Sequence, residues 1–279
     1  MSQDFEPSQE LKSNYYGKSL QEKKGWYREV SQAYDRVRPS YGDDLISKAI
    51  ALAQLAPQAK LLEIGSGPGT ATISFAKRGY KIVGLEPNST ACQIANQNCC
   101  EYPEVEILPL SVEEWEPQSD EFAAVVAASS LHWVAPNPGY AKIAQALKSF
   151  GSLILLWNTG FQPSDRAREL ISPIYQTYAP ALKPVKGKNK ERKELKSFEK
   201  IVVESGYFQH LKSEELMIEV TYSIEDYLLL LSTYSPYIVM KPQQRQDLFT
   251  ALKSCLQKEN FSQLNLSYLS ILQVFKKNS

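Results

Sequence analysis

Between Lys60 and Trp157 the sequence alternates short apolar runs with amphipathic segments, and this alternation restricts the possible folds more than any other feature. Five runs have the length and composition of buried strands, namely residues 60–64, 81–85, 105–108, 122–127 and 152–157. Between these runs, apolar residues recur at helical spacing near residues 70–78, 89–98 and 140–148. Strands that alternate with helices form parallel sheets through right-handed crossovers, with helices on both faces. The pattern therefore predicts a doubly wound α/β fold.

The segments outside this core are mainly helical. Residues 1–56 predict N-terminal helices, one of which ends near Pro39 because a residue before proline avoids the helical conformation. After a cofactor-binding core at 57–158, we expect helical insertions at 159–213 and 222–263 to form a cap or lid. Alternating apolar residues at 215–222 and 264–275 predict two more strands, which gives seven in a single domain over residues 1–279.

Composition narrows the classes of protein to consider. Basic and acidic residues both number 31, so net charge does not favour a nucleic-acid partner. The longest apolar runs have about six residues, whereas a membrane helix needs about 20, and the N-terminus lacks a signal-peptide pattern, so we expect a cytoplasmic protein. Residues 183–196 hold seven cations and two acids without interleaved aromatic residues, which favours a solvated lid over a nucleic-acid site. The four cysteines have no metal-site spacing, and no metal is expected.

A glycine-rich turn follows the first predicted strand, in "LLEIGSGPGT" (residues 61–70). Glycines at a strand-to-helix turn let the backbone approach a ligand closely. Gly65 and Gly67 fit a dinucleotide fingerprint, but Thr70 occupies its sixth position and the third glycine comes one residue early, at Gly69. Glu86 ends the second strand, where a carboxylate accepts hydrogen bonds from ribose hydroxyls. These features indicate an adenosine-containing ligand and leave open which one.

The full set of motifs resembles the class I S-adenosylmethionine-dependent methyltransferases. The set consists of the glycine turn, Glu86, "LSVEEW" (110–115) and "AASSLHWV" (127–134). Three further segments, "YDRVRPSY" (34–41), "SLHW" (130–133) and "STYSPY" (232–237), resemble the trans-aconitate-type branch of small-molecule enzymes. The resemblance implies a Rossmann-like, mainly parallel seven-stranded sheet with an antiparallel C-terminal strand. It also implies S-adenosylmethionine as cofactor and S-adenosylhomocysteine as product.

The resemblance assigns roles to individual residues of the cofactor site. The glycine turn would pass beneath the methionine part of the cofactor, with Glu63 near its ammonium group, and Glu86 would hold the ribose. Arg38 and Tyr41 would close over the cofactor or its carboxylate. The complete set of cofactor-binding candidates is Glu63, Gly65, Ser66, Gly67, Gly69, Glu86, Ser111, Val112, Ser129, Arg38 and Tyr41.

A sulfonium is an activated methyl donor, so the protein has mainly to align the acceptor and exclude water. Aromatic side chains stabilise such a cation, and Trp133, Tyr234 and Tyr237 are candidates for the substrate pocket. His132 follows the fourth strand and is the candidate catalytic base, although a carboxylate acceptor needs no base and a structural role remains an alternative.

The sequence thus predicts an S-adenosylmethionine-dependent methyltransferase that acts on a small molecule, at a carboxylate or another oxygen nucleophile. Three alternatives stay open. They are an RNA methyltransferase, a nicotinamide-dependent reductase and a protein that binds S-adenosylmethionine without turnover. The oligomeric state and the identity of the acceptor have no signal in the sequence.

Overall fold

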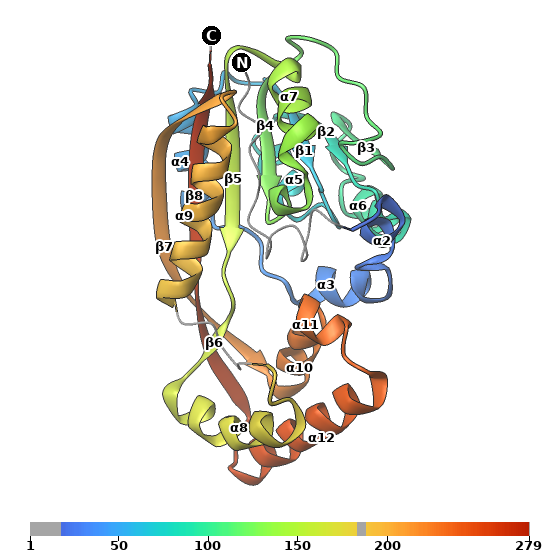
Figure 1. Cartoon of the computed structure of the whole chain (residues 1–279), viewed down its shortest axis with the longest axis vertical. Coiled ribbons are helices and arrows are strands. Elements are labelled where there is room, and N and C mark those ends of the chain that lie inside the picture. Colours follow the sequence, from blue (N-terminus) through green and yellow to red (C-terminus); the bar gives the residue numbers. More distant parts are fainter. Residues whose placement is uncertain (1–17, 183–187, 279) are drawn as a thin grey trace.

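One mixed sheet of eight strands connects all parts of the computed structural model, which describes residues 18–182 and 188–278. The strand order is β3-β2-β1-β4-β5-β8-β6, and β7 also pairs with β8. The strands are β1 (Lys60–Ile64), β2 (Lys81–Leu85), β3 (Val105–Leu108), β4 (Phe122–Ala128), β5 (Leu147–Asn158), β6 (Gln162–Pro163), β7 (Phe208–Ser223) and β8 (Gln263–Lys277). Figure 1 shows the sheet in the upper part of the molecule and a group of helices below it.

The pairing confirms the predicted parallel sheet with a reversed C-terminal strand. β1 is parallel to β2 and β4, β2 to β3, and β4 to β5, whereas β8 runs antiparallel to β5, β6 and β7. The structure adds one short strand to the seven that were predicted, because the two residues of β6 pair with β8 after the chain leaves β5. The carboxyl ends of β1, β2, β4 and β5 therefore lie at one edge of the sheet, where open α/β sheets bind ligands.

Helices cover both faces of the sheet and a third group lies beyond its carboxyl edge. The helices are α2 (Leu20–Gly25), η2 (Arg28–Val30), α3 (Ser31–Val37), α4 (Asp43–Ala53), α5 (Thr70–Ala76), α6 (Ser89–Asn98), η3 (Leu131–Trp133), α7 (Pro136–Ala146), α8 (Asp165–Tyr178), α9 (Lys188–Glu204), α10 (Ile224–Ser232), α11 (Ser235–Ile238) and α12 (Pro242–Lys258). None of the helices within the described ranges is long and apolar enough to cross a membrane.

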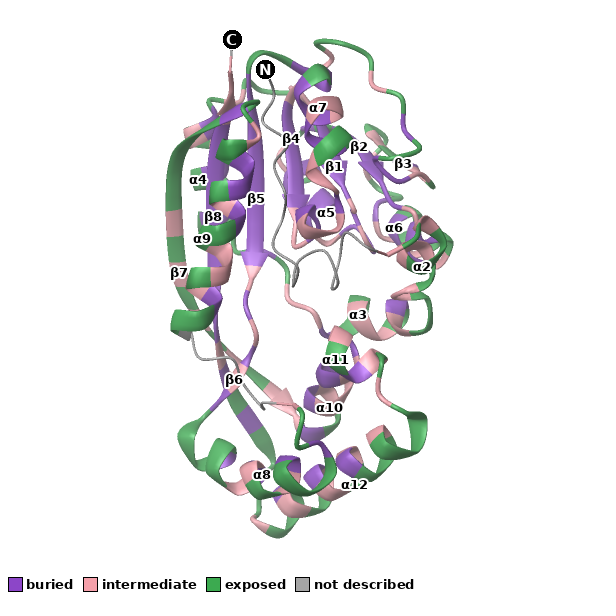
Figure 2. Ribbon diagram, in the orientation of Figure 1, coloured by how far each residue is buried: buried purple, intermediate pink, exposed green. Residues whose placement is uncertain are grey.

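Alternating residues of the central strands pack into two different layers. Leu62 of β1 and Ile271 of β8 belong to one apolar cluster, which α7 and α9 cover. The neighbouring residues Leu61 and Leu272 belong to the opposite cluster, which α4 and α5 cover. This period of two is the pattern of a sheet that is buried on both faces, and Figure 2 shows the central strands buried along most of their length.

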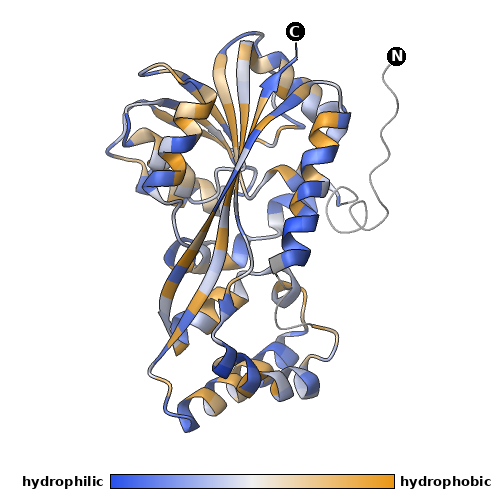
Figure 3. Cartoon of the chain, turned by 90° about the vertical axis from the view of Figure 1, so that its left-hand side faces the viewer, coloured by the Kyte–Doolittle hydropathy of each residue, from blue (hydrophilic) through white to orange (hydrophobic). Residues whose placement is uncertain are grey.

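The cap consists of α8, α10, α11 and α12, which share an apolar cluster of their own. The far ends of β7 and β8 contribute to this cluster, for example through Tyr222 and Leu264. β7 and β8 pair along their whole length, from Phe208 beside Lys277 to Ser223 beside Gln263. Figure 3 shows them as a twisted ribbon that runs from the sheet into the cap. The cap is thus attached to the sheet by continuous strands.

Two predicted segments differ from the structure in kind, and others differ in their bounds. The prediction of a solvated lid over 183–196 is wrong from residue 188 onwards, where α9 begins and packs on the sheet (residues 183–187 lie outside the described ranges). The reason is an apolar stripe at helical spacing, Leu195, Phe198 and Val202, which the many lysines obscured. The single N-terminal helix expected to end near Pro39 consists of three segments instead. The first, α2, ends at Gly25, and η2 and α3 follow.

Candidate active site

The glycine turn joins β1 to α5, and its three glycines have different roles. All three have positive φ angles, at 63° for Gly65, 56° for Gly67 and 90° for Gly69. A Cβ atom at Gly65 would lie 2.7 Å from the Cβ of Ser130, and one at Gly69 would lie 3.2 Å from the sulfur of Cys99, so these two permit close packing. A Cβ at Gly67 would meet nothing within 4 Å. Gly67 is therefore the position where the backbone is bared to open space.

Two adjoining pockets lie at the carboxyl edge of the sheet, on either side of this turn. The first pocket has an empty volume of about 930 Å³, which includes space that is open to solvent. Glu86, Ser111, Val112 and Trp133 line it together with residues from α2 to α3. The second pocket is smaller. Its lining residues include Arg38, Tyr41, Glu63, Ser66 and Asn158.

Glu86 connects the first pocket to the glycine turn. The side chain is 8% exposed, and its two carboxylate oxygens accept hydrogen bonds from the backbone N–H of Gly67 at 2.9 Å and of Asn88 at 2.8 Å. Burial raises the pKa of Glu86, and these two N–H donors act in the opposite direction. Because each carboxylate oxygen has a second lone pair, Glu86 can still accept hydrogen bonds from a ligand.

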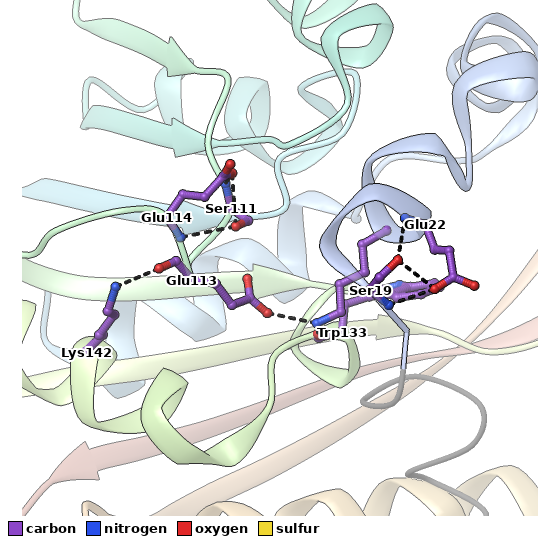
Figure 4. A network of polar contacts seen from close by, with 8 residues as sticks. Ser19, Glu22, Ser111, Glu113, Glu114, Trp133 and Lys142 are labelled. Carbon is purple, nitrogen blue, oxygen red and sulfur yellow. Dashed lines mark hydrogen bonds and ion pairs between the residues drawn. The ribbon is translucent and has the colours of Figure 1, made fainter.

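The segment after β3 forms another wall of the first pocket. The hydroxyl and the backbone N–H of Ser111 both donate to the side chain of Glu114, and Ser111 accepts from the Glu114 N–H (Figure 4). On the same wall, the amino group of Lys23 donates to Glu113 at 2.8 Å and to the carbonyl of Trp133 at 2.7 Å. Lys23 thus fastens α2 across the pocket. The backbone of Glu113 is held in turn by Lys142, at 2.9 Å.

Glu63 is the unusual group of the second pocket. It is 2% exposed, and its Oε2 accepts a 2.6 Å hydrogen bond from the hydroxyl of Thr72. Its Oε1 is buried without any hydrogen-bond partner. Burial raises the pKa of Glu63 to about 8, although the Thr72 hydroxyl counteracts this. A buried carboxylate oxygen without a donor destabilises the protein on its own, so the site calls for a cationic or hydrogen-bonding ligand.

Arg38 carries the opposite charge into the same pocket. Its guanidinium donates to the hydroxyl of Thr233 at 2.9 Å and to the Thr233 carbonyl at 3.2 Å. It also lies 4.0 Å from the ring centroid of Tyr234 and 5.0 Å from that of Tyr34. Within the described residues, no carboxylate lies within 4 Å of Arg38, so the guanidinium of Arg38 and the carboxyl of Glu63 lie in the same pocket without forming an ion pair.

Tyr41 and Ser129 close the pocket near the end of β4. The Tyr41 hydroxyl lies 3.1 Å from the Ser129 hydroxyl, and burial raises the pKa of Tyr41. Ser129 has a φ of 54°, and such left-handed backbone is uncommon for residues other than glycine and concentrates at functional sites. Of the predicted cofactor residues, all but Gly69 line one of the two pockets.

The four residues predicted for the substrate and for catalysis lie in four different places. Trp133 lines the first pocket. Tyr234 lines neither pocket, but its ring contacts the guanidinium of Arg38, which lines the second. Tyr237 lies in the core of the cap, where its hydroxyl is 2.7 Å from that of Tyr175. His132 lines neither pocket. Its ring lies 5.8 Å from Trp157 and 6.2 Å from Phe198, and burial lowers its pKa to about 4. Its role as a base stays a prediction.

Four wall residues from the N-terminal helices, Lys23, Tyr27, Ser31 and Tyr34, were not predicted. Tyr27, Ser31 and Tyr34 line the first pocket, and Tyr34 lines the second as well. Together with Arg38 they are spaced by four, three and four residues, which is one face of a helix. That spacing is visible in the sequence and would have pointed to all four residues of that face at once.

Comparison with known families agrees with this geometry. Residues 61–151 match the family described as a methyltransferase domain. An uncharacterized methyltransferase of Mycobacterium tuberculosis is 29% identical over 138 residues, which are 50% of this chain and 54% of that protein. Ribosomal RNA small subunit methyltransferase A of Thermotoga maritima is 36% identical over 66 residues, 23% of this chain and 24% of that protein. The chain thus spans about half the length, or less, of these relatives.

Solved structures show the same fold at low sequence identity. A proposed type II methyltransferase from Anaeromyxobacter dehalogenans has a TM-score of 0.59 and 18% identity, covering 85% of this chain and 97% of that one. The 4+2 cyclase SpnF has a TM-score of 0.57 and 15% identity, covering 93% and 97%. Because a protein named for another reaction has the same fold, the activity has to be inferred from the residues of the site and not from the fold. Residues 61–151 of this chain thus resemble a methyltransferase domain, and the whole fold is shared with solved methyltransferase structures.

Proposed function

We propose that this chain transfers a methyl group from S-adenosylmethionine to a small molecule. The observation that supports this most is that the second pocket holds the guanidinium of Arg38 and the buried carboxyl of Glu63, which an ammonium group would ionise. An α-amino acid carries one ammonium and one carboxylate group, so the amino-acid end of the cofactor complements both. The first pocket continues from there to Glu86, which suits a ribose.

The residues present fit the cofactor in three further respects. The free Oε1 of Glu63 is a buried acceptor for an ammonium N–H. Gly67 leaves the space that a side chain would fill. Val112 is 2% exposed and lines the first pocket beside Leu110, which gives the adenine an apolar surface. In this assignment Glu86 holds the ribose hydroxyls, and Arg38 holds the carboxylate of the methionine part.

When bound, S-adenosylmethionine supplies a methyl group that its sulfonium has already activated. The protein's part is to hold the cofactor, align the acceptor and exclude water. Lys23, Tyr27 and Ser31 wall the first pocket from the N-terminal side, and Lys23 fixes this wall to Glu113 and Trp133. The wall limits access from solvent, which favours a small acceptor over a large folded one.

The titratable groups of the pockets favour an acceptor that needs no base. Among the described residues, no histidine lines either pocket. Glu63 and Glu86 serve the cofactor in this assignment, and Glu113 pairs with Lys23. A carboxylic acid is already ionised at neutral pH, so its oxygen attacks without losing a proton. We therefore assign the acceptor to small carboxylic acids, with methyl esters as products.

The test uses the purified chain, methyl-labelled S-adenosylmethionine and a panel of small carboxylic acids, amines, phenols and RNA. We expect label in a product that releases methanol on mild base treatment, as esters do. Glu63→Gln is the matched control and should abolish labelling while the protein stays folded. Label in RNA would reassign the chain to RNA methylation. Calorimetric binding of S-adenosylhomocysteine without labelling of any acceptor would instead indicate a binding protein, and binding of NADH alone would indicate a reductase.

A further inference from the structure

The two pockets meet at a junction that six residues share. Four of the six, Gly65, Gly67, Pro68 and Ala128, offer only backbone or small apolar groups. The other two are Tyr34 from α3 and Ser129 after β4. In the proposed assignment the nucleoside lies on one side of the junction and the amino acid on the other. The sulfur atom that joins them therefore lies at the junction itself.

A sulfonium has no N–H or O–H proton, so conventional hydrogen bonds cannot stabilise it and C–H···O contacts contribute only weakly. It needs a negative charge or an electron-rich face nearby. Glu63 lines only the second pocket and Glu86 only the first. The Ser129 hydroxyl lies 3.1 Å from that of Tyr41. The ring of Tyr34 is thus the electron-rich surface that both pockets share.

We propose that Tyr34 makes the site distinguish the charged methyl donor from its uncharged product. This rests on the proposed function. Methyl transfer breaks the bond between sulfur and carbon, and the electron pair stays on sulfur, so the product has lost the positive charge. The contact with the Tyr34 ring is then lost as well. The residue favours binding of S-adenosylmethionine and release of S-adenosylhomocysteine.

The surroundings of Tyr34 hold its ring in place. The ring of Tyr27 meets it edge-on, with centroids 5.9 Å apart. The guanidinium of Arg38 lies 5.0 Å from the Tyr34 centroid, but it is closer to Tyr234 and bonded to Thr233. Arg38 is therefore held mainly by the cap, and Tyr34 is not needed to bind it.

The test measures the dissociation constants of S-adenosylmethionine and S-adenosylhomocysteine by calorimetry in the absence of an acceptor. We expect Tyr34→Leu to weaken the charged ligand about three- to thirtyfold more than the uncharged one, the range of a cation-π contact. Tyr34→Phe should keep the wild-type ratio because the ring remains. The matched control is Trp133→Leu, which removes an aromatic ring that lines the first pocket only and should change both affinities by the same factor.

Each outcome has one meaning. If neither ligand binds the wild-type protein, the proposed function fails. If both bind and the ratio in Tyr34→Leu equals that of the wild type, the role of Tyr34 is overturned while the cofactor site stands. A changed ratio in Tyr34→Phe would also overturn it, since the hydroxyl would then be responsible. If Tyr34→Leu does not fold, pentafluorophenylalanine at position 34 keeps the shape, weakens the electron-rich face, and should lower the ratio similarly.

Discussion

Replacing Gly67 with alanine should separate cofactor binding from stability. The φ of Gly67 is 56°, and an L-residue in left-handed backbone costs about 1–2 kcal/mol. The new Cβ meets no atom within 4 Å, so no further packing cost arises. We expect the melting temperature of the ligand-free protein to fall by about 2–4 °C per kcal/mol. The methyl group occupies the space over which the ligand would pass, so binding should weaken at least about 100-fold.

The chain offers a closely matched control in Gly79, which follows α5. Its φ is 81°, and a Cβ there would also meet nothing within 4 Å, but it lines neither pocket. Gly79→Ala should therefore lose similar stability and keep its affinity. In thermal unfolding at 100 times the wild-type dissociation constant, S-adenosylhomocysteine should add about 2.7 kcal/mol to the wild type and to Gly79→Ala. For Gly67→Ala the gain should be about 0.4 kcal/mol. Equal gains in all three proteins would refute the idea that Gly67 is bared for a ligand.

Three other substitutions test the neighbouring groups. Because burial raises the pKa of Glu63 to about 8, the carboxyl is mostly protonated at pH 7 without ligand, and an ammonium group should ionise it. Affinity for S-adenosylhomocysteine should thus rise with pH up to about 8, with calorimetric heats that depend on the buffer, and Glu63→Gln should remove both effects. Glu86→Gln should weaken S-adenosylhomocysteine and 5′-methylthioadenosine alike, whereas Glu63→Gln should spare the latter, which has no amino acid; equal losses would contradict the assignment. His132→Ala should leave both S-adenosylhomocysteine binding and turnover within about twofold, because the ring lines neither pocket and a carboxylate acceptor needs no base; a large loss of turnover with unchanged binding would show that His132 acts as a base and would refute this acceptor class.

Local patterns were sufficient for the first three strands, whereas β5 begins at Leu147, inside the segment predicted as a helix. β1 and β2 have the predicted bounds because each is an apolar run that ends at a turn. β7 is longer than predicted, since residues 209–213 in its first half are exposed and mainly polar and show no alternation. This half of β7 is a strand because it pairs with β8, and that pairing leaves no pattern in the local sequence.

The walls of the site depended on contacts between distant segments, which no local pattern reveals. Lys23 and Glu113 are 90 residues apart in the chain, and Trp26 bonds to Ser235 across 209 residues. His132 was expected to face the crevice because it follows β4. The short turn η3 instead places its ring among Trp133, Trp157 and Phe198, and the serines before it line the first pocket. The spacing of residues along the sequence does not show which way a side chain points when the backbone turns within one or two residues.

The position of β8 also affects how the chain folds during synthesis. This strand follows every other described helix and strand in the sequence, yet it lies between β5 and β7 and pairs with β6 as well. Until residues 263–277 have left the ribosome, the edge of β5 that pairs with β8 stays open. The core of the cap also lacks Leu264, Leu266 and Tyr268. The nascent chain must therefore keep the exposed edge of β5 from pairing with other chains. We expect this protein to depend on chaperones that shield hydrophobic strands until translation reaches β8.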